Sequence, residues 1–246
     1  MQKAQYGILR FAKYKGPEIS NIEAHNERKK GKYASNPDID NSRKNLNYHL
    51  VEPVGKYRAE SNRLIEEYRC RTRKDSVRVV EVLITATPEF FKGKKKSEIR
   101  AYFQTALEFI KKYQDSETIL SAVVHMDEKT PHMHLSFVPI TQDGRLCAKE
   151  ILVNKKKLTW WQDEFWKHMV EKYPDLERGE AASMTGREHI PPRLFKEAAH
   201  LTRQAKQITD LLENTNFFNA GKNTDKAVEL LQKFFPAMEN FQTQVR

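Results

Sequence analysis

Apolar positions along the chain predict both strands and helices. Residues 77–86 (VRVVEVLITA) are β-branched and nearly continuously apolar, which indicates a central strand. Weaker strand patterns cover residues 6–12, 118–125 and 132–140, and a short polar turn separates the last two. We therefore predict an α+β fold with a mainly antiparallel sheet, flanked by helices.

Helical periodicity is clearest in the segment that ends near Tyr113, for which Ser97 is the expected N-cap. One buried stripe is predicted there from apolar residues spaced by four, four and three positions: Ile99, Phe103, Leu107 and Ile110. Another stripe follows Asn154, and we expect it to be core rather than a base-stacking platform: Leu158, Trp161, Phe165 and Met169. Further helices are predicted over 18–28, 54–69, 193–214 and 224–235.

The Pro191–Pro192 pair separates the mixed pattern from the last two helical segments. We expect a main domain over residues 1–190 and a C-terminal helical extension over residues 191–246. Within the main domain, residues 29–50 are rich in Asn, Asp, Ser and Lys and carry Tyr33 and Tyr48. A polar stretch of this length is typical of a functional loop.

The net charge of the chain indicates which kind of binding partner it has. The 246 residues carry 43 Lys and Arg against 33 Asp and Glu, a formal net charge of +10, which favours a polyanionic partner such as nucleic acid or an anionic membrane. No apolar run approaches the roughly 18 residues that span a bilayer, and the first residues do not form a secretory signal. With only Cys70 and Cys147, the chain has too few cysteines for a disulfide framework, which fits a reducing bacterial cytoplasm.

Three of the eight histidines fall within ten residues. His132 and His134 point to the same face of a predicted strand, since side chains alternate, and a hairpin through Pro131 can bring His125 beside them. Three neutral imidazoles suit Mn²⁺, Co²⁺, Ni²⁺ or Zn²⁺ better than Mg²⁺. They also leave coordination positions open for a substrate oxygen, which is typical of a catalytic metal site.

Asp127 and Glu128 lie in the turn beside these histidines. Both can be solvated turn carboxylates. Glu128 can instead accept a proton from a nucleophile or orient an imidazole. The residues alone leave these roles open.

The pattern HxDExxPHxH over residues 125–134, with HNER at 25–28 and SRxxLNY at 42–48, resembles the Pre/Mob (MobV-type) plasmid mobilisation relaxases. These belong to the wider class of His-hydrophobic-His (HUH) endonucleases. LERG at 176–179 and RKD at 73–75 add weaker support, and the resemblance covers roughly residues 1–200.

The resemblance implies an HUH-type relaxase sheet of about five antiparallel strands, with residues 1–190 as the catalytic domain. It implies metal-dependent nicking and rejoining of one strand at a plasmid transfer origin by transesterification, which initiates conjugative mobilisation. On this chain it makes His25 the nucleophile, through a covalent 5′-phosphate intermediate, and Glu128 the base that activates it. The metal ligands are then His125, His132 and His134. Tyr48 is the rival nucleophile, because the wider class uses tyrosine.

The same resemblance suggests ligands and partners. Mn²⁺ is the expected ion, with Mg²⁺, Co²⁺, Ni²⁺ and Zn²⁺ as alternatives, and no nucleotide cofactor is expected. The expected partners are supercoiled or single-stranded transfer-origin DNA, with or without a hairpin, and the coupling protein of a conjugation system. The candidate DNA and phosphate contacts are Asn26, Arg28, Arg43, Arg73 and Lys74.

Family members usually continue into a long coiled coil for dimerisation and membrane association. This chain has no sustained heptads, so we expect a shortened or naturally short form, with a homodimer only in a longer one. Two other functions stay open: an HUH-class rolling-circle replication initiator, and a DNA-binding autoregulator with a non-catalytic metal site.

Overall fold

A computed structural model describes residues 4–30, 36, 38–152, 154–179 and 192–245. Its contacts divide the chain into two compact units, Met1–Ala181 and Ala182–Arg246. The domain boundary expected between residues 190 and 191 lies outside the described residues, as does Tyr33. None of the helices in the described ranges is long and apolar enough to cross a membrane.

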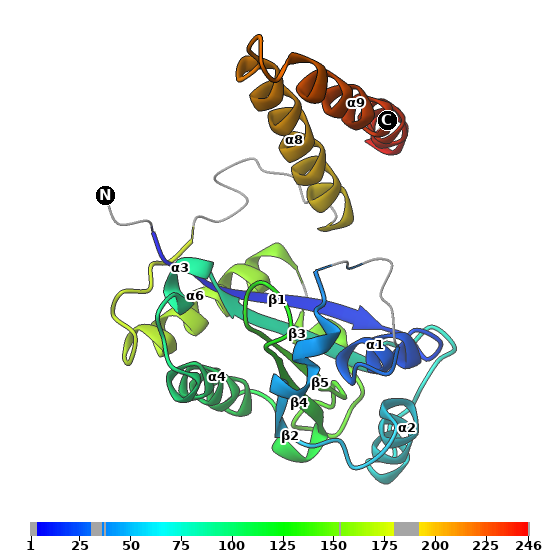
Figure 1. Ribbon diagram of the computed structural model, residues 1–246. Helices are drawn as coiled ribbons and strands as arrows, with labels where there is room; N and C mark the ends of the chain where they lie inside the picture. Colours follow the sequence, from blue (N-terminus) through cyan, green and yellow to red (C-terminus); the bar gives the residue numbers. More distant parts are fainter. Residues whose placement is uncertain (1–3, 31–35, 37, 153, 180–191, 246) are drawn as a thin grey trace. The chain divides into compact units, whose positions relative to one another are not determined.

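The first unit is built on a five-stranded sheet in the order β1-β3-β5-β4-β2, in which every neighbouring pair is antiparallel (Figure 1). The strands are β1 (Gly7–Tyr14), β2 (Tyr48–Val51), β3 (Val79–Ala86), β4 (Ile119–His125) and β5 (His132–Phe137). The predicted α+β fold with a mainly antiparallel sheet is therefore confirmed. Strand β5 is the middle strand, and its residues pair with both β3 and β4.

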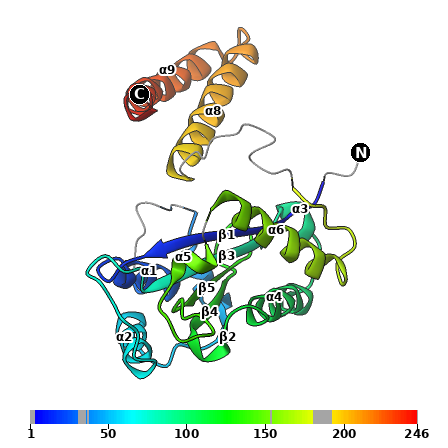
Figure 2. The ribbon, with the colours of Figure 1, turned by 180° about the vertical axis from the view of Figure 1, so that it is seen from behind.

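Helices cover both faces of this sheet. The long helices of the first unit are α1 (Ile19–Asn26), α2 (Tyr57–Glu67), α4 (Lys96–Lys111) and α6 (Lys155–Val170). The short ones are α3 (Pro88–Phe91), α5 (Ala148–Ile151), and the 3-10 turns η1 (Asn41–Leu46) and η2 (Ser116–Thr118). Helices α1 and α2 lie together, apart from α4 and α6 (Figures 1 and 2). The second unit holds α8 (Pro192–Glu213) and α9 (Ala220–Val245).

Strand alternation sorts the side chains of β5 between two environments. Met133, Leu135 and Phe137 are buried in the larger apolar cluster, together with side chains of α4 and α6. A smaller cluster joins α1 and α2 to Val79, Leu120 and Val138. His132 and His134 alternate with the apolar residues of β5, so they lie on the opposite face of the sheet, where His25 of α1 approaches them.

Most of the predicted stripes are confirmed. The stripe of α4 is fully buried, and in α6 Trp161, Phe165 and Met169 are buried, whereas Leu158 is 41% exposed because it lies in the first turn of the helix. Helix α6 begins directly after Asn154, which is its N-cap and accepts a hydrogen bond from the Lys157 amide. Ser97 is not the cap of α4, because the Glu98 carboxylate accepts from the Lys95 amide at 2.7 Å and the helix begins at Lys96.

Two boundaries differ more from the prediction. The expected loop over residues 29–50 contains η1 and the start of β2, since Tyr48–Val51 pairs with β4. A four-residue strand has too little pattern of its own to be detected, and its pairing partner stabilises it. Helix α9 continues past residue 235 to Val245 and includes Pro236.

Candidate active site

The three clustered histidines meet on two adjacent strands. His125 ends β4 and pairs in register with His132 at the start of β5, while His134 pairs with Val123. The ring centroids are 5.1 Å apart for His125 and His132, 4.9 Å for His125 and His134, and 5.1 Å for His132 and His134. The hairpin thus brings all three predicted ligands to one point.

Backbone carbonyls orient two of these rings. His125 Nε2 donates to the Asn26 carbonyl at 2.8 Å, and His132 Nδ1 donates to the Thr130 carbonyl at 2.9 Å. In the neutral rings the opposite nitrogens, His125 Nδ1 and His132 Nε2, then carry lone pairs, and they lie 3.3 Å apart. Two lone pairs that face each other, with the outer nitrogens held by acceptors, are the arrangement that metal-binding histidines adopt.

The third imidazole, His134, shares a group of close ligand atoms with His125 but not with His132. His134 Nε2 is buried and has no hydrogen-bond partner among the residues that the structure describes. Glu128 Oε1 lies 3.5 Å from His132 Nε2, so a carboxylate also faces the lone pairs. Two overlapping groups have ligand atoms within 4.8 Å of one another: His25, His125 and His134, and His125, Glu128 and His132.

Burial keeps the imidazoles of His125 and His132 neutral. Desolvation, followed by the charge of His134, lowers the pKa of His132 to about 4 and holds that of His125 well below its ordinary 6.5. A neutral ring is the form that binds a metal. The donor set therefore fits a borderline divalent cation.

His25 reaches the cluster from α1. Its ring centroid lies 5.1 Å from that of His134 and 5.6 Å from that of His125. Burial, with the charges of His134 and Arg28, lowers the pKa of His25 to about 4, so the ring is neutral and nucleophilic near pH 7. The arrangement can therefore present an imidazole nitrogen to a phosphate held at the three histidines.

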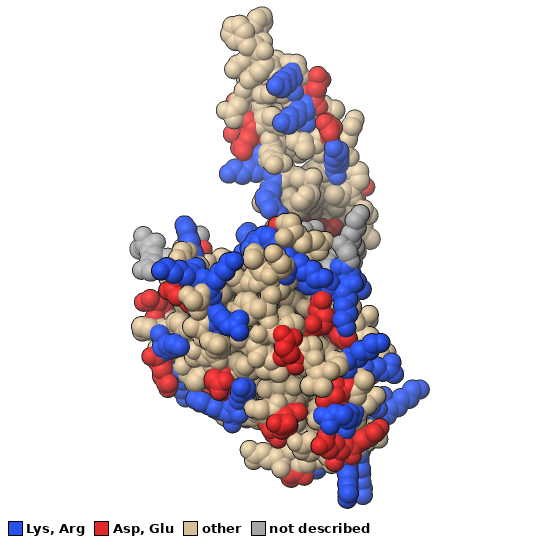
Figure 3. Space-filling model, turned by 60° about the horizontal axis from the view of Figure 1, so that its bottom comes forward, with Lys and Arg blue, Asp and Glu red and all other residues tan. Residues whose placement is uncertain are grey.

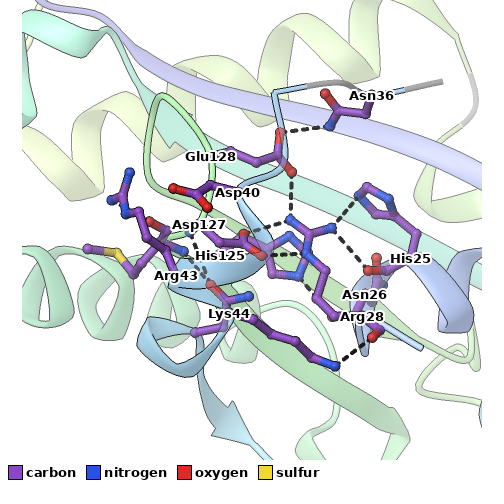
Figure 4. A network of polar contacts seen from close by, with 12 residues as sticks. His25, Asn26, Arg28, Asn36, Asp40, Arg43, Lys44, His125, Asp127 and Glu128 are labelled. Atoms are coloured by element: carbon purple, nitrogen blue, oxygen red, sulfur yellow. Dashed lines mark hydrogen bonds and ion pairs between the residues drawn. The ribbon is translucent and has the colours of Figure 1, made fainter. Parts of the chain in front are cut away.

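Arg28 joins the end of α1 to the turn between β4 and β5 (Figure 4). Its guanidinium binds both carboxylate oxygens of Asp127 at 2.8 Å, and its Nη2 donates to Glu128 Oε1 at 2.7 Å. Its Nη1 lies 3.4 Å from His25 Nε2 and 3.1 Å from the His25 carbonyl oxygen. The predicted nucleophile and the predicted base are thus linked through this arginine.

Glu128 is held as a carboxylate. Its Oε2 accepts from Asn36 Nδ2 at 2.8 Å, in addition to the Arg28 contact. Burial acts to raise the pKa of Glu128, but His132, Asn36 and Arg28 outweigh it and lower that pKa. The ionised state suits a proton acceptor.

The five candidate phosphate contacts are placed very differently. Asn26 and Arg28 are each only 2% exposed and have partners within the protein. Arg43 is exposed on η1, with Nη2 donating to the Met126 carbonyl at 2.7 Å. Arg73 and Lys74 are exposed before β3, at the strand end opposite Thr85, the residue that pairs with His132.

Tyr48 faces away from the histidines. It pairs with Val124, and its ring packs against the larger apolar cluster, with the Arg100 guanidinium 4.7 Å from the ring centroid. Its hydroxyl is buried without a hydrogen-bond partner in the described part of the chain. Burial raises the pKa of Tyr48 to about 12, so the hydroxyl stays protonated. The rival nucleophile therefore lies on the other face of the sheet.

Two residues of the site, Asn47 and Glu81, were not predicted from the sequence. Asn47 Oδ1 accepts from the amides of Met126 and Asp127 and holds the turn in place. Glu81 lies within β3, where its Oε1 is 2.8 Å from Asn26 Nδ2 and 3.2 Å from His134 Nδ1. A single acidic residue inside an apolar strand was the available signal, because a buried carboxylate requires partners.

Comparison with known proteins identifies relatives over most of the chain. The family described as plasmid recombination enzyme (Mob_Pre) matches residues 3–197. A plasmid recombination enzyme type 1 of Staphylococcus aureus is 38% identical over 207 residues, which are 82% of this chain and 51% of that protein. A plasmid recombination enzyme of Bacillus thuringiensis is 35% identical over 84% of this chain and 46% of its own length. The chain thus spans about half the length of these relatives.

Solved structures agree. The Mn-bound MobM relaxase domain (MOBV; Mob_Pre) in complex with plasmid oriT DNA matches with a TM-score of 0.72 and 30% identity, over 78% of this chain and 98% of that one. The same domain with a longer oriT DNA matches with a TM-score of 0.61 and 28% identity, over 76% of this chain and 97% of that one. By sequence and by fold, this chain belongs to the Pre/Mob (MobV-type) family of plasmid recombination enzymes and relaxases.

Proposed function

We propose that the chain is a relaxase, which nicks and rejoins one DNA strand at a plasmid transfer origin through a covalent intermediate on His25. The observation that carries this proposal is a neutral His25 ring 5.1 Å from that of His134, beside three convergent histidines. The family supports it, as do the MobM relaxase structures, which hold Mn and oriT DNA.

His125, His132 and His134 would hold the divalent cation, and Mn²⁺ is the ion that we propose. Such a cation polarises a non-bridging phosphate oxygen and offsets the negative charge that builds up in the transition state. The remaining chemistry belongs to side chains of this protein.

A neutral imidazole nitrogen of His25 attacks the scissile phosphorus. A P–N bond forms as the P–O3′ bond breaks, and the leaving strand ends in a 3′-hydroxyl. The proton lost by the His25 ring is accepted by Glu128, which is ionised, and the leaving 3′ oxygen takes up a proton from solvent. Arg28 contacts both side chains and orients them, but a guanidinium does not relay the proton. In the reverse reaction the 3′-hydroxyl attacks the phosphoramidate, so rejoining requires no nucleotide cofactor.

DNA is the partner that the net charge of +10 favours. On the face shown in Figure 3, basic side chains are scattered among acidic ones rather than gathered in one patch. This favours backbone attraction spread over a broad surface. A coupling protein remains an expectation from the family, and so does dimerisation of longer members.

The decisive experiment incubates the chain with a supercoiled plasmid that carries its transfer origin, with Mn²⁺ or with EDTA. Relaxed circles and protein attached to a labelled 5′ end are scored for wild type, His25→Ala and Tyr48→Phe. We expect nicking with Mn²⁺ only, its loss in His25→Ala with an acid-labile adduct in wild type, and little change in Tyr48→Phe.

Loss of nicking in Tyr48→Phe alone would move the nucleophile to tyrosine. Tight DNA binding by wild type without nicking would instead support the DNA-binding regulator. Nicking at a replication origin but not at the transfer origin would support the initiator.

A further inference from the structure

Asn26 directly follows the proposed nucleophile and is the last residue of α1. It is 2% exposed, so it does not present its amide to DNA. Its backbone carbonyl and its side-chain nitrogen both bond within the protein. The backbone carbonyl oxygen accepts from His125 Nε2 at 2.8 Å, and the side-chain Nδ2 donates to Glu81 Oε1 at 2.8 Å. The carboxylate can only accept, which fixes which end of the amide faces it.

Glu81 connects the same residue to another histidine. Its Oε1, the oxygen that Asn26 contacts, lies 3.2 Å from His134 Nδ1. Tyr14 donates to the other oxygen, Oε2, at 3.4 Å. One carboxylate oxygen therefore lies close to both a candidate metal-binding ring on β5 and the end of the helix that carries His25.

These contacts form a closed path between the histidines and α1. One side runs from His134 through Glu81 to the Asn26 side chain, and the other runs from His125 to the Asn26 carbonyl. A carboxylate or carbonyl behind a metal-bound imidazole fixes the orientation of that ring. Here both such acceptors converge on the residue beside the nucleophile.

We propose that Asn26 and Glu81 form a latch, which couples occupation of the histidine site to the position of His25. Both are positioning residues, because neither needs to touch DNA. The inference rests on the proposed function for the identity of the nucleophile. The coupling itself is a property of the protein without DNA.

The first test is therefore made without DNA, on the full chain. Hydrogen exchange is followed in the peptide of residues 19–30, with and without Mn²⁺. The amides of Glu27, Arg28 and Lys29 bond to carbonyls of α1 and report on the order of its last turn. We expect Mn²⁺ to slow their exchange in wild type and to slow it less in Asn26→Ala, which loses the contact with Glu81 but keeps the backbone carbonyl that His125 contacts, at Mn²⁺ concentrations that saturate both proteins.

Isosteric changes sharpen the test. Asn26→Asp keeps the shape but removes the donor and places a carboxylate against Glu81, so it should also reduce the Mn²⁺ effect. The matched control is Asn21→Asp, the same change at an exposed position of the same helix. Glu81→Gln should weaken Mn²⁺ binding by about 10-fold, the typical cost of losing a charged acceptor behind a metal ligand, and Asn21→Asp should leave it unchanged.

With transfer-origin DNA, Asn26→Ala should slow single-turnover strand cleavage at saturating Mn²⁺ by about 10- to 100-fold, since a misplaced nucleophile loses rate. Asn21→Asp should cleave at the wild-type rate. The losses in Asn26→Ala and Glu81→Gln should be less than additive in the double variant, because the two residues act through one contact.

Equal protection by Mn²⁺ in wild type and Asn26→Ala would overturn the latch. So would a Glu81→Gln protein that melts earlier but binds Mn²⁺ normally, since the role of Glu81 would then be purely structural. If Asn26→Ala does not fold, the same hydrogen-exchange comparison is made with Glu81→Gln, which changes the other partner of the Asn26–Glu81 hydrogen bond. Failure of wild type to nick DNA would remove the proposed function and leave the exchange result to decide the coupling.

Discussion

At the scale of single residues, Arg28 was expected to contact phosphate, but in the structure it is a buried residue that forms ion pairs within the protein. Its side chain is 2% exposed and binds Asp127 through two parallel hydrogen bonds and Glu128 through a third. Its φ of 49° is in the left-handed region, which a non-glycine residue occupies only when its surroundings hold it there. We interpret Arg28 as the residue that neutralises a buried acidic pair beside the histidines.

This role predicts a large effect on stability. Arg28→Ala leaves two carboxylates without their cation and should lower the free energy of unfolding by about 3–5 kcal/mol, the usual cost of breaking a buried ion pair. Arg28→Lys keeps the charge but cannot form the paired hydrogen bonds, so its loss should be smaller. Urea unfolding measures both. Arg58→Ala, at an exposed position of α2, is the control, and an equal effect of the two alanine variants would contradict the interpretation.

At the scale of elements, Glu27 joins three of them. It is the C-cap of α1, accepts from Tyr57 of α2 at 2.6 Å, and lies 3.1 Å from His49 Nε2 of β2. Burial acts to raise the pKa of Glu27, but hydrogen bonds from His49 and Tyr57 outweigh it and lower that pKa. The hydrogen bond to Glu27 raises the pKa of His49 despite partial burial. Helix α1 is thus held on the sheet by an ion pair as well as by apolar packing.

The two shifts define a pH window. A lowered carboxylate pKa stabilises the fold above the ordinary value of 4.5, and this is lost as the pH falls. A raised histidine pKa stabilises it below 6.5, and this is lost as the pH rises through the folded-state pKa. The drop in melting temperature caused by His49→Gln, measured in EDTA, should therefore be largest between these values. His200→Gln, exposed on α8, is the control, and a drop that is constant from pH 4 to 9 would contradict the prediction.

At the scale of the whole molecule, the candidate site belongs to the first unit alone. The candidate ligands, His25 and their supporting residues all lie before Ala181, and both apolar clusters of that unit use residues from Leu9 to Leu176. Helices α8 and α9 form the second unit and bury Leu201, Ile208 and Ala227. Each unit therefore has apolar residues of its own.

A chain that ends at residue 191 should consequently keep the melting temperature of the first unit and its affinity for Mn²⁺, because no residue of either cluster is removed. Thermal unfolding and Mn²⁺ titration of the shortened and full chains test this. Loss of cooperative melting in the shortened chain would show that α8 and α9 contribute to the fold of the first unit.

Much of the fold and of the candidate site could be predicted, because these features depend on residues that are close together in the chain. The spacing of Ile99, Phe103 and Leu107 specifies a buried helix face, and the alternation of His132, Met133 and His134 separates ligand from core within three residues. Strand β2 could not be predicted, because four residues paired with β4 owe their structure to that partner.

By itself the sequence determined the strand and helix pattern apart from β2, the three clustered histidines and their separation from the apolar core. Only the tertiary structure decided which side chains join them. It put Tyr48 on the opposite face of the sheet and Arg73 at the far end of β3, and it brought Glu81 to Asn26 across 55 positions of sequence. Periodicity is a property of one segment, whereas a hydrogen bond between segments depends on how the sheet is ordered and which helix covers it.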